Sequence, residues 1–152
     1  MGVFGERHTI MQEDQISKYP NTFFRVSLKA VIENEEGEIL CVKEAGSDWT
    51  LPGGGLDHGE TIENGLRREL FEEVALAQDT PFLYQPIGHD IMWVDSRQAW
   101  QLWVIFRVTF DVLPQFSKGV DADDVQFINP QSFKDSPYRA QQLIYKWLVD
   151  PL

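Results

Sequence analysis

The segment from Thr61 to Leu76 carries acidic side chains where a surface helix would keep apolar ones. Thr61 is a good N-cap, because its hydroxyl can accept a hydrogen bond from a free amide of the first turn. At about 100° per residue, the apolar residues fall on one arc of about 120°; they are Ile62, Leu66, Leu70 and Val74. The pattern predicts an amphipathic helix that ends near Ala75.

Three glutamates of this helix lie beside or within its apolar arc. With Ile62 at 0°, Glu73 projects at about 20°, Glu69 at about 340° and Glu72 at about 280°. The far side, at about 180–240°, holds Asn64, Arg68 and Phe71. Burying unpaired carboxylates costs several kcal/mol each, and a divalent cation is the simplest partner for them. On the helix alone, the alternative is an ordinary acidic edge with an i,i+4 pair between Arg68 and Glu72.

Most of the remaining chain has strand patterns. Residues 23–32 alternate, with Arg25, Ser27 and Lys29 on the face opposite the main apolar residues. Residues 34–37 form a predicted turn, and residues 39–43 would return as the partner strand of a hairpin. Further strands are expected at 82–94, 100–112 and 125–128, a glycine loop at 52–55, and a last helix at 137–149. This order predicts an α/β fold with a mixed sheet and helices packed on it.

The segment from Gly54 to Leu76 resembles the Nudix box. That motif reads Gly, five residues, Glu, seven residues, Arg-Glu-aliphatic, one residue, Glu-Glu, one residue, Gly-aliphatic. Gly54, Glu60, the Arg68-Glu69-Leu70 triplet, Glu72-Glu73 and Leu76 match it, and Ala75 replaces the usual glycine. That glycine ends the family's helix in a left-handed conformation, which alanine disfavours by about 1 kcal/mol. The resemblance implies a Nudix-type α/β/α sandwich, a single domain over residues 1–152 with a peripheral segment at 1–20.

The resemblance also implies site residues and a metal. Glu69, Glu72 and Glu73 would hold Mg²⁺ or Mn²⁺, together with the backbone carbonyl of Gly53. Glu69 is the candidate for orienting or deprotonating the attacking water, although family members differ in which glutamate does this. Arg68 would position a carboxylate, with Glu60 as a partner.

Other candidates lie outside the motif. A later acidic loop offers Asp121, Asp123 and Asp124 as an additional metal ligand, and Asp121 is preferred by its spacing. Arg25 and Lys29 share a strand face and are candidates for binding substrate. Three tryptophans could stack on a base, but each fits a packed strand better; they are Trp93, Trp100 and Trp103.

Composition limits the partners. The chain has 13 basic and 24 acidic residues, a net charge of −11, which disfavours duplex nucleic acid and anionic membranes. A small phosphorylated substrate remains compatible, because a bound cation can reverse the local charge.

Cys41 lies in an apolar run and is expected to be a buried small residue. Without a signal-peptide pattern or a long apolar run, a cytoplasmic protein is expected.

The expected activity is hydrolysis of a diphosphate linkage in a nucleoside diphosphate derivative. Nucleoside triphosphates and nucleotide sugars are favoured, because the signatures of several other Nudix substrate classes are absent, and RNA 5′ ends fit poorly with the net charge. Two alternatives remain: a nucleotide-binding Nudix domain without catalysis, and an isomerase acting on an isoprenoid diphosphate. The sequence leaves the substrate and the oligomeric state open.

Overall fold

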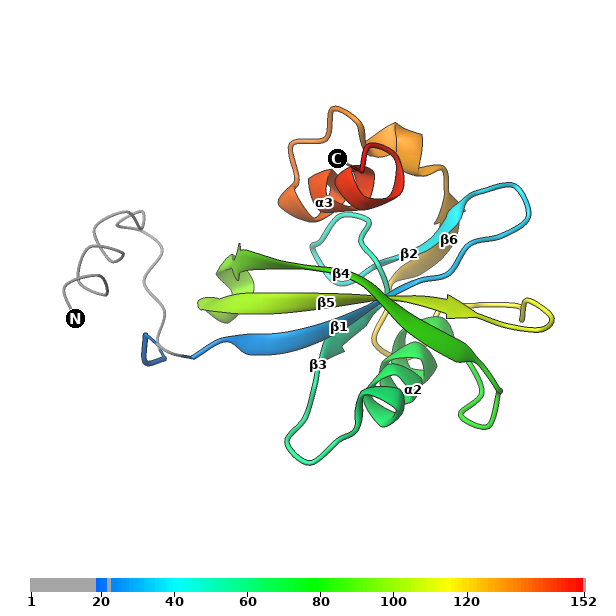
Figure 1. The fold of residues 1–152 in the computed structure, drawn as a ribbon, viewed down its shortest axis with the longest axis horizontal. Coiled ribbons are helices and arrows are strands. Elements are labelled where there is room, and N and C mark those ends of the chain that lie inside the picture. The colour runs from blue at the N-terminus through cyan, green and yellow to red at the C-terminus, as the bar shows by residue number, and fades with distance from the viewer. Residues whose placement is uncertain (1–18, 22, 152) are drawn as a thin grey trace.

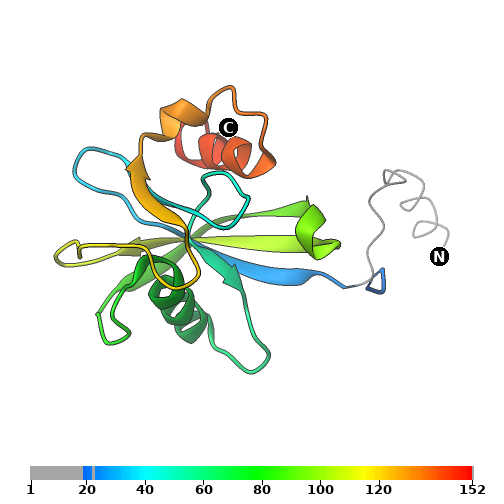
Figure 2. The same ribbon diagram turned by 180° about the vertical axis from the view of Figure 1, so that it is seen from behind.

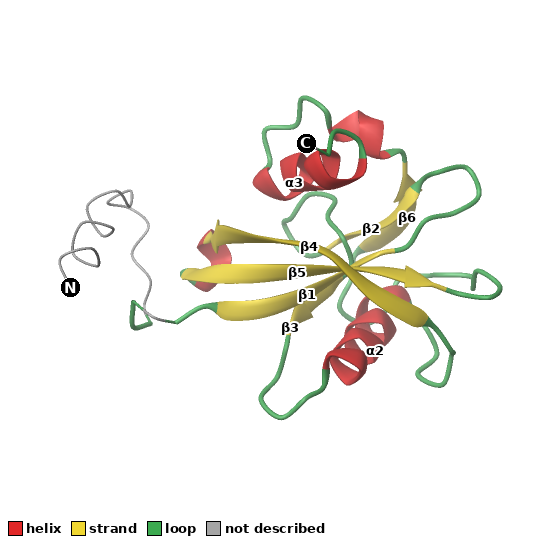
Figure 3. Ribbon diagram, in the orientation of Figure 1, coloured by secondary structure: helices red, strands yellow, loops and turns green. Residues whose placement is uncertain are grey.

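A four-stranded mixed sheet forms the centre of the computed structural model, which describes residues 19–21 and 23–151. Its strands are β3 (Gly53–Gly55), β1 (Arg25–Val31), β5 (Ala99–Thr109) and β4 (Leu83–Val94), in that order across the sheet. β1 is parallel to β5, and the other two pairs are antiparallel. Figures 1 and 3 show this sheet nearly edge-on, with the remaining elements above and below it.

Helices cover both faces of the sheet, so the predicted α/β/α sandwich is confirmed. Helix α2 (Ile62–Val74) lies on one side and helix α3 (Arg139–Leu148) on the other, as both views of the ribbon show (Figures 1 and 2). Leu66 and Leu70 of α2 pack in one buried cluster with Leu28 of β1. Leu143 of α3 packs in the second cluster with Ile105 of β5. Alternating side chains of the central strands therefore enter two separate cores.

The predicted hairpin between residues 23–32 and 39–43 forms only at its turn, where Glu33 and Ile39 make an antiparallel bridge, and the predicted pairing of the two strands is wrong. Strand β2 (Ile39–Lys43) pairs with β6 (Asp124–Ile128) in a second, two-stranded sheet. The chain does turn at residues 34–37, and Leu40 N still donates to Ile32 O. Beyond that point β1 is already hydrogen-bonded on both edges, by β3 and β5, so β2 has no free edge to join.

The ends of α2 follow the sequence closely. Thr61 accepts a hydrogen bond from the amide of Asn64, which confirms the N-cap. The helix ends with Ala75 in the left-handed conformation (φ 56°, ψ 30°), where the family motif has glycine. The Leu76 amide then donates to Leu70 O, so the turn closes despite the alanine.

Two burial predictions need correction. Ile62 belongs to the predicted apolar stripe of α2 but is 40% exposed, at the first residue of the helix. On β5, alternation predicts one packed face, which is buried at Phe106 and Val108 but only partly buried at Trp100, Leu102 and Val104. On the opposite face Gln101 and Trp103 are buried, and Trp103 packs in the cluster with Leu143 of α3.

Other elements match or add to the expectations. Cys41 is fully buried, and burial raises the pKa of its thiol to about 12, so it remains a neutral core residue. Short 3₁₀ helices follow β4 at Asp95–Arg97 and β6 at Pro130–Phe133. None of the helices in the described part of the chain is long and apolar enough to cross a membrane. The predicted peripheral segment at 1–20 lies almost entirely outside the described residues.

Candidate active site

Helix α2 directs two glutamates into the protein interior. Glu73 is 2% exposed and Glu69 is 8% exposed, as the position of their side chains beside the apolar arc predicted. Burial raises the pKa of both carboxyl groups, that of Glu73 to about 9, against smaller opposing effects of nearby cations. Two carboxyl groups that resist ionisation on one helix are an expensive arrangement for a purely structural element, and they fit a site that a cation completes.

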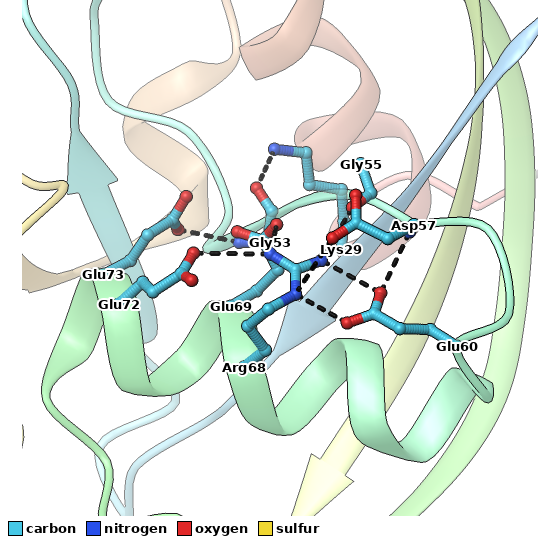
Figure 4. Close-up of polar contacts among 9 residues, drawn as sticks. All are labelled: Lys29, Gly53, Gly55, Asp57, Glu60, Arg68, Glu69, Glu72 and Glu73. Carbon is cyan, nitrogen blue, oxygen red and sulfur yellow. Dashed lines mark hydrogen bonds and ion pairs between the residues drawn. The ribbon is translucent and has the colours of Figure 1, made fainter.

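Arg68 is the centre of the polar network shown in Figure 4. Its Nε donates to Glu60 Oε1 at 2.6 Å and its Nη2 donates to Glu60 Oε2 at 3.0 Å. Its Nη1 donates to Glu69 at 2.8 Å and to Glu72 at 3.3 Å. The hydrogen bonds from Arg68 hold the pKa of Glu60 at about 2, well below its usual range. The predicted supporting role of Arg68 therefore has a geometric basis: it fixes two α2 carboxylates from one anchor.

The carboxylate of Glu73 links α2 to strand β3. Its Oε2 accepts a hydrogen bond of 2.8 Å from the amide of Gly53. Glu44, which follows β2, adds a smaller contribution that raises the pKa of the Glu73 carboxyl beyond the effect of burial. The sequence did not indicate Glu44, because residue 44 and residue 73 meet only through the tertiary fold.

The three glycines of β3 let charged side chains approach the backbone closely; the sequence had placed them in a loop. A Cβ on Gly54 would lie 2.7 Å from a carboxylate oxygen of Glu69. A Cβ on Gly55 would lie 2.0 Å from the guanidinium of Arg25. The run is a strand because it pairs with residues 27–29 of β1, and its missing side chains leave room for the site.

Lys29 is a buried cation between the carboxylates and an aromatic ring. Its Nζ donates to the Gly53 carbonyl at 2.6 Å and lies 4.9 Å from the centroid of the Trp103 ring. Burial raises the pKa values of Glu69 and Glu73, and the charge of Lys29 opposes part of that rise. The carbonyl that was predicted to bind a metal is thus satisfied by an ammonium group in this structure.

A loop after β5 holds the C-terminal end of α2. The amides of Ser117, Gly119 and Asp121 donate to the carbonyls of Val74, Glu73 and Glu72, in that order. A Cβ on Gly119 would lie 2.2 Å from Glu72 O, so only glycine fits there. Asp121 therefore reaches the helix through its backbone, while its exposed side chain remains only a predicted metal ligand.

An open cavity of about 430 Å³ adjoins these groups. β1 and β5 line it with Arg25, Lys29, Gln101 and Trp103, and the loop before β3 adds Glu44 and Trp49. Arg97, from the connection between β4 and β5, provides another cation that the sequence did not indicate. Trp93 and Trp100 contact each other edge-to-face at 5.7 Å, and neither lines the cavity.

The predicted metal ligands are neighbours but do not converge as ligands. Within residues 19–21 and 23–151, no group of three or more Asp, Glu, His or Cys side chains is arranged so that it could hold a metal ion. Arg68 holds Glu69 and Glu72, while the Gly53 amide holds Glu73. A cation would have to replace Arg68 Nη1 on the first two groups. Glu60 and the Gly55 carbonyl would still anchor the same guanidinium.

The sandwich and the site define a class: an α/β/α domain whose first helix carries an arginine–glutamate cluster beside an open cavity. A family model described as the NUDIX domain matches residues 23–148, so the chain belongs to the NUDIX family. The predicted resemblance is thereby confirmed.

The relatives are bacterial RNA pyrophosphohydrolases. The chain is 43% identical to that of Actinobacillus succinogenes over 152 residues, covering 84% of this chain and 77% of the relative. It is 44% identical to that of Tolumonas auensis over 57 residues, which cover 37% of this chain and only 33% of the relative. A MutT protein from Methanosarcina mazei has the same fold, with a TM-score of 0.69 and 16% identity, over 85% of this chain and 96% of that one.

Proposed function

We propose that the chain hydrolyses a diphosphate linkage in a nucleotide derivative, with Mg²⁺ or Mn²⁺ as cofactor. The observation that carries the proposal is the placement of the Arg68 network and the buried Glu73 against the glycines of β3, whose other side lines a cavity together with Arg25 and Lys29. Buried carboxylates and backbone oxygen are hard donors that suit such cations. The bound cation would neutralise charge that develops on the phosphates during attack by water.

The residues of the chain have separate roles in this proposal. Glu69, Glu72, Glu73 and the Gly53 carbonyl would hold the cation, with Asp121 as a further candidate. Glu69 would orient the water, since it is the more enclosed of the two glutamates held by Arg68. Arg68 would position both carboxylates from its anchor on Glu60. Arg25 and Lys29 would bind substrate phosphate, because they supply positive charge at the cavity floor.

Two substrate classes stand out within this activity. Free nucleoside triphosphates or nucleotide sugars fit the cavity volume, which lies within the usual range for small-molecule sites. RNA 5′ ends are the second class, favoured by the names of the relatives. The net charge disfavours RNA at long range, but the local cations Arg25, Lys29 and Arg97 favour its terminal phosphates.

The test is turnover by the purified protein with Mg²⁺ on a panel of nucleoside triphosphates, nucleotide sugars and 5′-triphosphorylated RNA. Release of phosphate, pyrophosphate or, from a nucleotide sugar, a nucleoside monophosphate with a sugar phosphate is expected from at least one class. Glu72→Gln should abolish nearly all turnover while leaving the folded state intact, because the amide binds a cation weakly. Glu63→Gln is the matched control: Glu63 lies on the same helix, pairs with Arg67 and should be dispensable for turnover.

The alternatives give different results in the same experiment. A domain that only binds nucleotides would show affinity without product. An isomerase would leave the whole panel unchanged and would convert an isoprenoid diphosphate, added as a further substrate, without breaking its diphosphate linkage. If Glu72→Gln retained full activity while wild type turned over substrate, the assignment of the site would be wrong.

A further inference from the structure

Gln101 lies in the floor of the cavity, and its side chain is held by two donors. Ser27 Oγ donates to Gln101 Oε1 at 3.1 Å, and Trp103 Nε1 donates to the same oxygen at 3.2 Å. Gln101 is 7% exposed, and all three residues line the cavity. The proposed catalytic roles use none of these contacts.

The two donors determine which way the amide faces. An indole nitrogen can only donate, so the atom next to Trp103 Nε1 must be the amide oxygen. A flipped amide would place its NH₂ group against an N–H donor. The geometry therefore fixes Oε1 toward Ser27 and Trp103, and Nε2 on the other side.

Gln101 Nε2 has no hydrogen-bond partner among the described residues. In the same part of the chain, the side-chain polar atoms that are both fully buried and unpartnered are Thr50 Oγ1 and Trp100 Nε1, so Gln101 Nε2 keeps some exposure, and Gln101 lines the cavity. Two amide hydrogens are thus fixed in direction and open to the cavity. A fixed donor in a largely buried site favours ligands that supply an acceptor and penalises those that present another donor.

The register of the sheet separates the Gln101 amide from Lys29, the cation that lies next to the carboxylates. Gln101 pairs with Arg25, whereas Lys29, which bonds to Gly53, lies four residues further along β1. At about 3.3 Å per residue, the two levels are ~13 Å apart. The Arg25 side chain reaches back to Gly55, which pairs with Ser27, so its guanidinium lies nearer Lys29 than its backbone does. A nucleotide with its phosphates near these two cations would extend its base toward Gln101, with Trp103 at the level between them.

We propose that Gln101 Nε2 selects the base of the substrate by donating to a ring carbonyl, so that oxo bases are preferred over amino bases. The proposal rests on the proposed function only in taking the substrate to be a nucleotide. The group recognised is the same in a free nucleotide and in the first nucleotide of an RNA.

The test compares bases that differ in a single group. Inosine triphosphate and ATP differ in an oxygen against an amino group, and UTP and CTP differ in the same way. Wild type should show a kcat/KM at least about tenfold higher for the oxo member of each pair. Gln101→Glu should reverse that ratio, because the acid keeps an acceptor for Ser27 and Trp103 while replacing the open donor with an acceptor.

A matched control distinguishes recognition of the base by residue 101 from the general effect of one added negative charge. Gln85→Glu adds the same charge on the exposed part of β4 and should leave the ratio unchanged. A merely structural role of Gln101 would alter stability or overall rate, but not the order of the two bases. Equal ratios in wild type and Gln101→Glu would overturn the proposal.

Binding makes the outcome independent of catalysis. Titration of tryptophan fluorescence with inosine and adenosine monophosphates, without metal, should show the same preference and the same reversal. If no substrate were hydrolysed but this reversal appeared, the proposed function would fail and the role of Gln101 would stand. Hydrolysis without any base preference would support the proposed function and overturn the proposed role of Gln101.

A last comparison shows whether the recognised base belongs to a free nucleotide or to the first nucleotide of an RNA. Short 5′-triphosphorylated RNAs that begin with inosine or adenosine are compared with the free nucleotides. A preference confined to RNA supports Gln101 as a reader of the first nucleotide of an RNA, and a preference in both supports a reader of nucleotides in general.

Discussion

The carboxylate of Glu73 accepts a hydrogen bond of 2.8 Å from the amide of Gly53, 20 residues earlier in the chain. This bond joins the glutamate helix to the edge strand of the sheet, at the point where Lys29 holds the carbonyl of the same glycine. The amide and the carbonyl of Gly53, which belong to the two peptide units on either side of its Cα, thus both contact charged side chains of the candidate site. The position of Gly53 therefore controls the position of the site.

Gly53→Ala should lower the free energy of unfolding by more than about 3 kcal/mol. Gly53 has φ +128°, and its added Cβ would lie 1.9 Å from the carbonyl oxygen of Leu28. Chemical denaturation measures the effect. Gly59→Ala is the control, since Gly59 has φ +85° and open space around it, so it should cost only about 1–2 kcal/mol. Equal losses in the two variants would show that the close approach to Leu28 is unimportant.

Glu60→Gln should destabilise the protein near neutral pH and have little effect in strong acid. The pKa of Glu60 is about 2 in the folded protein and 4.5 in its ordinary environment, so the folded state favours the charged form. That contribution is fully present above about pH 4.5 and is lost as the pH falls toward 2. Denaturation of both proteins from pH 7 to pH 2.5 should show their difference, about 1–2 kcal/mol at pH 7, shrinking steadily. A difference that is constant with pH would contradict the Glu60–Arg68 account.

Gly119→Ala should loosen the loop that holds the end of α2. The added Cβ would meet Glu72 O at 2.2 Å and break the adjacent bond from the Gly119 amide to Glu73 O. We expect a loss of about 1–3 kcal/mol in stability, and faster hydrogen exchange at residues 117–121 than in wild type. Gly46→Ala has no neighbour within 4 Å of its Cβ and should leave exchange in that loop unchanged. Unchanged exchange in Gly119→Ala as well would refute the role of the loop.

Thr50→Val should maintain or raise stability, by up to about 1 kcal/mol, because an unpartnered buried hydroxyl is removed. Thr61→Val makes the same substitution at the N-cap and should lower stability by about 1 kcal/mol, because the bond to the Asn64 amide is lost. Thermal unfolding of the two variants compares them directly. A substantial loss in Thr50→Val would mean that its hydroxyl has a partner in solution.

The bounds and the buried face of α2 could be predicted from the sequence because they depend on local interactions. The N-cap at Thr61, the buried arc of Leu66, Leu70 and Val74, and the inward direction of Glu73 all depend on residues within a few turns of one another. The spacing of Arg68 from Glu69 and Glu72 follows from the same helical period. These properties need no information about the rest of the fold.

The pairing of the strands could not be predicted from the sequence in the same way. The turn at residues 34–37 forms as predicted, but whether β2 joins β1 depends on which strands already occupy the edges of β1. The glycines of β3 looked like a loop because their reason to be extended lies in β1 and in the charged groups that approach them. Strand pairing is a long-range property, whereas alternation reports only which side of a strand is buried.

The sequence by itself determined the glutamate helix, its caps, the family and the inward direction of two carboxylates, because all of these follow from short-range spacing. Only the tertiary structure decided that Glu44 meets Glu73, that Gly119 fits against Glu72, and that Lys29 reaches Gly53. It also fixed the amide of Gln101 between Ser27 and Trp103. The physical reason is the same in each case: these contacts join segments far apart in the chain, and their geometry exists only once the strands have found their neighbours.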